Sequence, residues 1–181
     1  HEAFSKMRAR GAKVADLAIL VVAADDGVKP QAKEVIQVLK ETETPFIVAI
    51  NKIDKNNADP ERIKQELAQE GVMLEGFGGN VSWHAISAKT GEGVGELLDL
   101  ILLAAEMENL TYSPKAETKG IIIEAKMDSR RGLTAIAIVR DGILRIGDEI
   151  TTESALGKIK ILENFLGERV EELAPSSPAL I

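Results

Sequence analysis

The sequence contains no cysteine, and only two of its 181 residues are histidine. Without cysteine the chain has no disulfide framework, no thiol nucleophile and no cysteine-based zinc site. The two imidazoles, His1 and His84, are separated by a spacing that matches no metal-ligand motif. We therefore expect no metal site in this chain.

Long hydrophobic runs and targeting segments are also missing. The longest apolar stretches, such as residues 17–24, are far shorter than the roughly 20 residues needed to cross a bilayer. No signal-like segment is visible. These features predict a cytoplasmic protein with no membrane partner. The composition, 45% hydrophobic and 28% charged, predicts a folded chain of one or two domains.

The chain has no excess of basic charge. It carries 22 basic and 29 acidic side chains, which gives a formal net charge of -7. General nucleic-acid binding depends on clustered Lys and Arg that release counterions, so this charge argues against it. One local cluster remains, because Lys126, Arg130 and Arg131 surround Asp128 at an expected loop. It could contact RNA phosphates or be a solvated hairpin tip.

The most informative motif is Asn51-Lys52-Ile53-Asp54, which directly follows the apolar run of residues 45–50. Ligands of open parallel sheets bind beyond the carboxyl ends of the strands, and Asn51 is the first residue past an expected strand end. An ionised Asp54 can accept hydrogen bonds from two adjacent donors, which are what N1-H and the 2-amino group of guanine present. Asn51 can donate toward the purine N7 and O6 edge, and the aliphatic stem of Lys52 can lie over the ring.

A second polar segment, Ser87-Ala88-Lys89, follows the next expected strand, residues 81–86. Two loops that leave adjacent strands could grip one base, with the backbone N-H of Ala88 available for the guanine O6. The alternative is that Asn and Asp after a strand are ordinary turn or helix-cap residues. The placement of both segments after buried strands favours a guanine site.

The first half of the chain alternates strands and helices. Continuous apolar runs at residues 17–24 and 46–50 predict parallel strands that are covered on both faces. Helical spacing predicts helices that begin near Gln31, Asp59 and Val94. Asp59 suits an N-cap, and Gly71 suits the position that follows a helix. This order is typical of half of a doubly wound sheet.

The pattern changes after a polar connector at residues 109–118. Segments 120–126, 133–140 and 158–162 are rich in Ile, Val and Thr, and they predict strands. Asp141-Gly142 and Leu166-Gly167-Glu168 suit tight turns. Short strands without intervening helices predict a small antiparallel barrel.

The chain contains no Gly-x-x-x-x-Gly-Lys-Ser/Thr segment. It therefore lacks the loop of backbone amides that would cradle nucleotide phosphates next to the base site. Asp25-Asp26-Gly27 could suggest metal ligation, but two carboxylates without further oxygen ligands define no magnesium site. We expect a turn there instead.

Several segments resemble one family. Asn51-Lys52-Ile53-Asp54 and Ser87-Ala88-Lys89 match the base-recognition motifs of small GTPases. The chain as a whole resembles the bacterial-type translation initiation factor 2 family of translational GTPases. Residues 24–31 resemble translational GTPases in particular, and residues 1–4 and 7–12 resemble the initiation factor branch of that family. Residues 132–135 and 141–148 resemble the second domain of the same branch.

The resemblance implies a fold and a domain order. The fold is an α/β partial P-loop GTPase domain, the C-terminal half of a doubly wound parallel sheet, followed by a small antiparallel β-barrel. We expect residues 1–110 to form a truncated GTP-binding domain, 111–118 a linker, and 119–181 a second-domain barrel truncated at its C-terminus. The chain is thus expected to be an internal piece of a longer protein.

The resemblance also implies a function. Asn51, Lys52 and Asp54, with Ser87, Ala88 and Lys89, would bind the guanine base of GTP or GDP. His1 matches the catalytic histidine that orients water against the γ-phosphate. The complete protein would need Mg²⁺, whose ligands this chain lacks, and would couple GTP hydrolysis on the ribosome to subunit joining. The piece alone is expected to be inactive.

Partners follow from the same resemblance. The barrel would dock on ribosomal RNA of the small subunit, and initiator tRNA would be bound only through domains absent from this chain. Two alternatives stay open. The chain could serve only as a ribosome-docking module, or it could come from an elongation or selenocysteine-specific factor.

Overall fold

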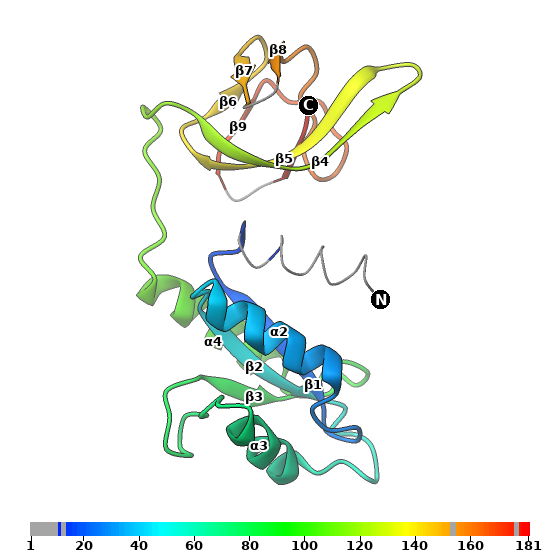
Figure 1. The fold of residues 1–181 in the computed structure, drawn as a ribbon, viewed down its shortest axis with the longest axis vertical. Helices are drawn as coiled ribbons and strands as arrows, with labels where there is room; N and C mark the ends of the chain where they lie inside the picture. Colours follow the sequence, from blue (N-terminus) through cyan, green and yellow to red (C-terminus); the bar gives the residue numbers. More distant parts are fainter. Residues whose placement is uncertain (1–10, 12–13, 153–154, 176–177) are drawn as a thin grey trace. The chain divides into compact units, whose positions relative to one another are not determined.

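The computed structural model describes residues 11, 14–152, 155–175 and 178–181. They divide into two compact units, His1–Leu110 and Thr111–Ile181, which are described separately below (Figure 1). No helix within the described ranges is long and apolar enough to cross a lipid bilayer.

The first unit is built on a three-stranded parallel sheet with the order β1-β2-β3. The strands are β1 (Ala18–Ala23), β2 (Phe46–Asn51) and β3 (Trp83–Ala85), and the helices are α2 (Pro30–Glu41), α3 (Pro60–Gln69) and α4 (Val94–Met107). This alternation confirms the predicted partial doubly wound sheet. The third strand is shorter than the expected segment 81–86.

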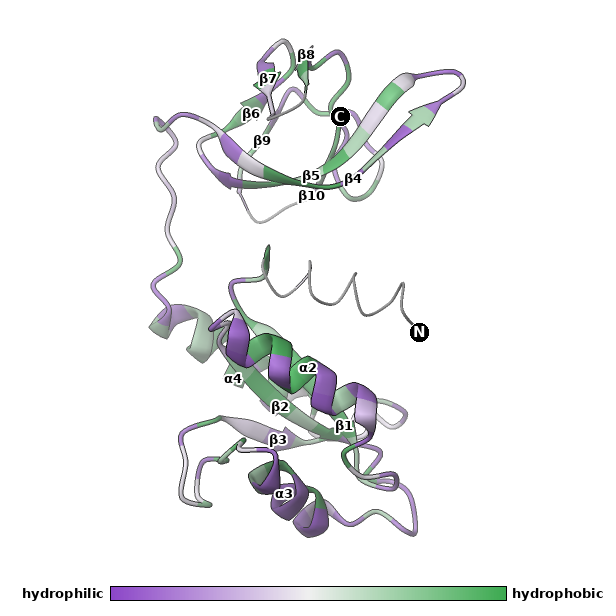
Figure 2. Cartoon of the chain, viewed as in Figure 1, coloured by the Kyte–Doolittle hydropathy of each residue, from purple (hydrophilic) through white to green (hydrophobic). Residues whose placement is uncertain are grey.

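The sheet is covered on both faces at its centre. On one face, Val48 and Ile50 of β2 pack in one cluster with residues of α2 and α3. On the other face, Ile47 and Ala49 pack with residues of α4. Side chains of a strand alternate between faces, so β2 must be apolar throughout, and Figure 2 shows it hydrophobic along its length.

Local signals set the helix ends in this unit. The Asp59 side chain accepts a hydrogen bond of 3.0 Å from the Arg62 N-H, and Pro60 occupies the first helical position of α3. Gly71 follows the helix with a φ of 71°, a conformation that glycine adopts without steric cost. Both predicted signals are confirmed.

The second unit is antiparallel and contains no helix among its described residues. Strand β5 (Gly132–Asp141) pairs with β4 (Lys119–Asp128) on one side and with β10 (Pro178–Leu180) on the other. Two short pairs complete the unit: β6 (Leu144–Arg145) with β9 (Glu172–Leu173), and β7 (Glu149–Thr151) with β8 (Leu156–Lys158). These antiparallel pairs confirm the predicted class of the second half.

One predicted strand of this unit is wrong. Residues 158–162 were expected to pair as a strand, but β8 ends at Lys158. Ile159 and Leu162 instead pack into the core with Val139, Leu144 and Ala179. Their apolar character reflects this burial outside a ladder, which a pattern of Ile and Leu alone does not distinguish from a strand.

Strand β1 lies at an edge of the described sheet and is covered on one face only. Its Ile19 and Val21 stand in register with Ile47 and Ala49, on the side that α4 covers over β2. Yet Ile19 is 44% exposed and Val21 is 56% exposed. An open edge with apolar side chains is a template for pairing with another chain.

We therefore predict that the 181-residue chain self-associates through β1. Sedimentation velocity at several concentrations should show a coefficient that rises with concentration. Val21→Lys should suppress the rise, because a lysine at a strand edge opposes pairing. Leu156→Lys is the matched control, since Leu156 is also an exposed apolar residue but lies in the second unit. A concentration-independent monomer would contradict this prediction.

Candidate functional site

The carboxyl ends of β2 and β3 bring the two polar segments together. Asn51 is the last residue of β2, and the Ile86 N-H donates to the Ile50 carbonyl at 2.8 Å, just beyond the end of β3. The Ile53 N-H then donates to the Ile86 carbonyl at 3.3 Å. These backbone hydrogen bonds place the loop that begins at Lys52 against the loop that begins at Ser87.

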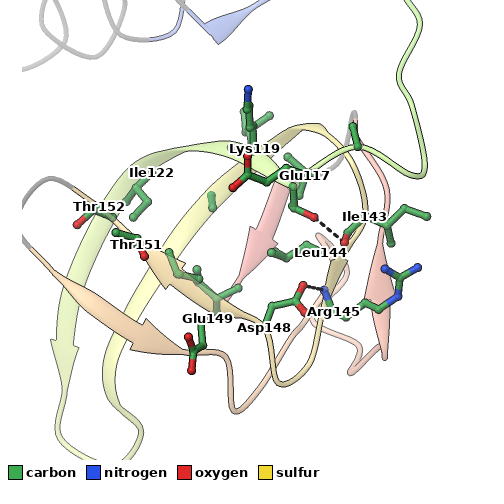
Figure 3. A pocket seen from close by; sticks show the side chains of 18 residues that line it. Glu117, Lys119, Ile122, Ile143, Leu144, Arg145, Asp148, Glu149, Thr151 and Thr152 are labelled. Carbon is green, nitrogen blue, oxygen red and sulfur yellow. Dashed lines mark hydrogen bonds between the residues drawn. The ribbon is translucent and has the colours of Figure 1, made fainter.

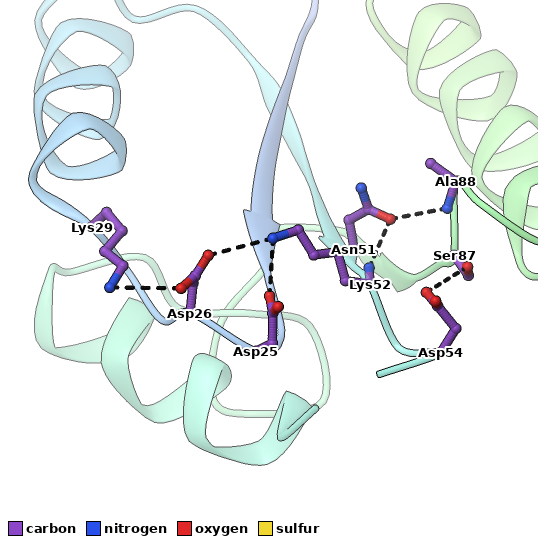
Figure 4. Close-up of polar contacts among 8 residues, drawn as sticks. All are labelled: Asp25, Asp26, Lys29, Asn51, Lys52, Asp54, Ser87 and Ala88. Carbon is purple, nitrogen blue, oxygen red and sulfur yellow. Dashed lines mark hydrogen bonds and ion pairs between the residues drawn. The ribbon is translucent and has the colours of Figure 1, made fainter. Parts of the chain in front are cut away.

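The Asn51 side chain joins the two loops (Figure 4). Its Oδ1 accepts hydrogen bonds from the backbone N-H of Lys52 at 2.7 Å and of Ala88 at 3.0 Å. With its oxygen held in this way, the amide has its NH₂ donors left for a ligand. The Ala88 N-H was expected to be available for the guanine O6, but here it donates to the Asn51 side chain.

Asp54 is held by the second loop. Its Oδ1 accepts a hydrogen bond of 2.7 Å from the hydroxyl of Ser87, which is fully buried. The Ser87 Oγ in turn accepts from the Thr90 N-H at 3.2 Å. A carboxylate has about four lone-pair positions, so this contact fixes Asp54 without using up its capacity to accept.

Charge at Asp54 is favoured by its surroundings. The Ser87 hydroxyl holds the pKa of the Asp54 carboxyl below its ordinary value, against a smaller opposing effect of desolvation. The positive charges of Lys89 and Lys55 lower it further. Asp54 is therefore an ionised, acceptor-only group at neutral pH, as recognition of paired donors requires.

The ammonium of Lys52 reaches a third loop, a contact that the sequence did not predict. Its Nζ lies 3.2 Å from Asp25 Oδ1 and 3.4 Å from Asp26 Oδ2, both in the turn after β1 (Figure 4). Its backbone φ is 67°, a left-handed value that is uncommon for residues other than glycine. These contacts raise the pKa of Lys52, with Asp25 as the larger cause.

Asp25 is the residue that sequence reasoning missed. Its Oδ1 is buried and has no hydrogen-bond partner among the described residues, but it forms an ion pair with the Lys52 ammonium 3.2 Å away. The ion pair therefore supplies the compensation that a buried carboxylate needs. A signal existed in the sequence, because an acidic residue after the neighbouring parallel strand falls at the same edge of the sheet.

The predicted turn at Asp25-Asp26-Gly27 is confirmed. The N-H groups of Asp26 and Gly27 both lie 3.2 Å from the Ala23 carbonyl, and Gly27 has a φ of 88°. In the described part of the chain, no group of three His, Cys, Asp or Glu side chains is placed to hold a metal ion. His1, the expected catalytic residue, lies outside the described residues.

Two family models match consecutive parts of the chain. The model described as the elongation factor Tu GTP binding domain matches residues 1–107. The model described as elongation factor G domain 2 matches residues 117–181. Together they cover both structural units.

Among curated proteins, the chain is 48% identical to translation initiation factor IF-2 of Alkaliphilus metalliredigens, over 98% of this chain and 25% of that protein. It is 49% identical to the chloroplastic IF-2 of Rhodomonas salina, over all of this chain and 24% of that protein. The chain thus spans about a quarter of the length of these relatives.

Solved structures of translation factors share the fold. GDP-bound aIF5B from Aeropyrum pernix matches with a TM-score of 0.77 and 27% identity, over 99% of this chain and 38% of that chain. Elongation factor SelB from Methanococcus maripaludis, in complex with the GTP analogue GppNHp, matches with a TM-score of 0.76 and 28% identity, over 99% of this chain and 40% of that chain.

We predict that Ser87→Ala raises the pKa of Asp54. The hydroxyl is the main cause of the lowered value, so its loss should return the carboxyl toward its ordinary pKa of 3.8. Carboxyl-carbon NMR titrations of wild type and variant measure the shift. Because the pKa of Asp54 is lowered in the folded state, the hydrogen bond contributes to stability at a pH above the pKa of the unfolded state. This contribution disappears as the pH falls through the pKa of the folded state. Ser82→Ala, outside this pair, should leave the titration unchanged.

We also predict that Asp25→Asn lowers the pKa of Lys52 more than Asp26→Asn does. Asp25 is the larger cause of the raised value and the more buried of the two carboxylates. Because the pKa of Lys52 is raised in the folded state, the ion pairs contribute to stability in full below a pH of about 10.5. This contribution is lost as the pH rises through the folded-state pKa. NMR titration of the Lys52 side chain measures both variants. Equal shifts would show that the ion pair with Asp25 is not the dominant contact.

Proposed function

Because this chain belongs to the family of elongation factor Tu GTP-binding domains, we propose that its first unit binds the guanine base of GTP and GDP. Asn51, Asp54 and the loop of Ser87, Ala88 and Lys89 carry this role. The observation that carries the proposal is the hydrogen bond of 2.7 Å from the buried Ser87 to Asp54, which presents an ionised carboxylate beside the Asn51 amide.

The chemistry of guanine fits this arrangement. Guanine presents N1-H and a 2-amino group side by side, and an ionised carboxylate is the side chain that accepts from both. Asn51 has its oxygen engaged within the protein, so its NH₂ is the group that can donate to N7 or O6. Adenine places a donor where guanine has O6 and has no hydrogen at N1, so it cannot satisfy Asp54 and Asn51 in the same pose.

Lys52 takes a modified role in this proposal. Its ammonium is anchored by Asp25 and Asp26, so its stem runs from the base side of the sheet toward the turn after β1. We propose that a bound base lies against this stem and that the ion pairs keep the stem in place. The Ala88 N-H acts indirectly, because it fixes the Asn51 oxygen.

The residues of this chain do not supply a phosphate-binding loop. Backbone amides of a glycine-rich loop and Mg²⁺ provide much of the affinity and charge stabilisation in P-loop enzymes. The sequence holds no such loop. The 181-residue chain by itself is therefore expected to bind guanine nucleotides weakly and not to hydrolyse GTP.

For a complete protein that contains this segment, we propose a cytoplasmic translation initiation factor that hydrolyses GTP on the ribosome. The support is the similarity to IF-2 proteins at 48–49% identity across almost the entire chain. In that protein His1 would assist hydrolysis, Mg²⁺ would accompany the phosphates, and hydrolysis would be coupled to subunit joining. Initiator tRNA would be bound by other domains.

A second role, ribosome docking by the barrel, is supported by the tip of the β4–β5 hairpin. Asp128 accepts hydrogen bonds from the backbone N-H groups of Arg130 and Arg131, both at 2.8 Å, and so fixes the backbone of two cationic residues at the tip. The Arg131 guanidinium also pairs with Glu163 at 3.0 Å, which leaves less free charge than the sequence indicates. We propose that Lys126 and Arg130 meet phosphates of small-subunit ribosomal RNA.

The base assignment is tested by Asp54→Asn in a complete IF-2 that carries this segment. Xanthine replaces the 2-amino donor of guanine with a carbonyl acceptor, and an Asn amide offers the matching donor and acceptor. The variant should lose about tenfold or more in GTP affinity and gain in XTP affinity. Competition of GTP against XTP measures both changes.

Asp59→Asn is the matched control, because Asp59 caps α3 and does not lie in the site. It should keep the wild-type preference for GTP. If Asp54→Asn also keeps that preference, Asp54 is a structural residue and the guanine assignment fails.

A further inference from the structure

Among the described residues of the second unit lie two neighbouring cavities of different chemistry. One, of about 790 Å³, is bordered by charges of both signs, including Glu117, Lys119, Arg145 and Asp148 (Figure 3). The other, of about 410 Å³, lies against the β4–β5 hairpin and the segment from Ala155 to Ile161. The smaller cavity falls in the size range of small-molecule sites and has the more uniform lining.

The wall of the smaller cavity is aliphatic. Its apolar lining residues include Ile122, Leu133, Ile150, Leu156, Ile161 and Leu180, and its described lining contains no aromatic residue. Nucleic-acid bases are usually held by stacking on aromatic rings or on Arg planes. A lining of branched hydrocarbon side chains instead suits a hydrocarbon chain, whose burial depends on contact area alone.

The charged residues described in the lining of this cavity are basic. Among the described residues that line it, these are Arg131, Lys158 and Lys160 and none is acidic, although the chain as a whole carries a net charge of -7. Arg131 is engaged by Glu163, while no ion pair of Lys158 or Lys160 occurs within the described ranges. Glu149 stands opposite Lys158 in the β7–β8 pairing but borders the larger cavity.

From this lining we propose that the smaller cavity binds an aliphatic chain that ends in an anionic group, either a carboxylate or a phosphate. The chain occupies the hydrocarbon wall, and Lys158 and Lys160 face the anion. This site is separate from the guanine site, which lies in the first unit. Its ligand class is thus independent of the proposed nucleotide function.

A matched series of ligands tests the proposal on the 181-residue protein. Octanoate, octyl phosphate, octanol and octylammonium share one chain and differ in the head group. Methyl NMR spectra, recorded below micelle concentrations, should show saturable shifts at Ile122, Ile150 and Ile161 for the two anions. Octanol should bind more weakly than the two anions, and octylammonium should bind most weakly of the four. The tighter of the two anions identifies the natural head group.

Chain length provides a second readout. Each methylene added between hexanoate and octanoate should tighten binding by up to about fourfold, because a buried methylene is worth about 0.8 kcal/mol. Leu133→Ala removes an apolar side chain from the cavity wall at an exposed position. It should weaken the binding of the anions and of the alcohol to the same extent.

Charge is tested by substitutions that keep the stem of the side chain. Lys158→Gln and Lys160→Gln should each weaken octanoate binding by about two- to fivefold and leave octanol unchanged. Lys119→Gln is the matched control, since Lys119 lines the larger cavity. The proposal is overturned if octanol or octylammonium binds as tightly as octanoate. Shifts confined to the first unit, or an equal effect of Lys119→Gln, would also overturn it.

Discussion

The candidate site depends on one hydrogen bond, from the buried Ser87 hydroxyl to Asp54 at 2.7 Å. It ties the loop after β2 to the loop after β3, and it lowers the pKa of a carboxyl that is already ionised at neutral pH. Asn51 makes the second tie between the same loops through the Ala88 N-H. Because both ties are internal, the proposed base-binding side chains are positioned by contacts within the protein.

The sheet makes these ties possible. Strands β2 and β3 are parallel and adjacent, so the segments that follow them emerge at the same edge. Burial of β2 on both faces, by α2 and α3 on one side and α4 on the other, holds that edge in place. The same order brings Asp25, after β1, within reach of Lys52. Three loops from three neighbouring strands thus form one polar network.

Much of this arrangement could be predicted from the sequence. Continuous apolar runs identified β1 and β2, and the cap residues Asp59 and Gly71 identified the ends of α3, because these signals are local. The pairing of Asn51-Lys52-Ile53-Asp54 with the Ser87 loop followed from strand order. What the sequence does not encode locally is the choice among several possible hydrogen-bond partners.

Two differences show this limit. The Ala88 N-H could face a ligand or a neighbouring side chain, and the short side chain of Asn51 is close enough to take it. The sequence suggests that the Lys52 stem can lie over a base, but it does not tell where the ammonium goes, and the turn after β1 offers both Asp25 and Asp26. In the second unit, Ile159 and Leu162 are apolar because they fill the core, although they form no strand.

The central claim is that the base-recognition groups are preformed for guanine without the phosphate-binding half. The most direct measurement is NMR shift mapping of the 181-residue chain with guanosine, inosine and adenosine at equal concentrations. The account predicts saturable shifts at residues 51–54 and 87–89 with guanosine, weaker shifts with inosine because it lacks the 2-amino donor, and none with adenosine. Equal shifts with guanosine and adenosine, or no shifts in these loops, would contradict it.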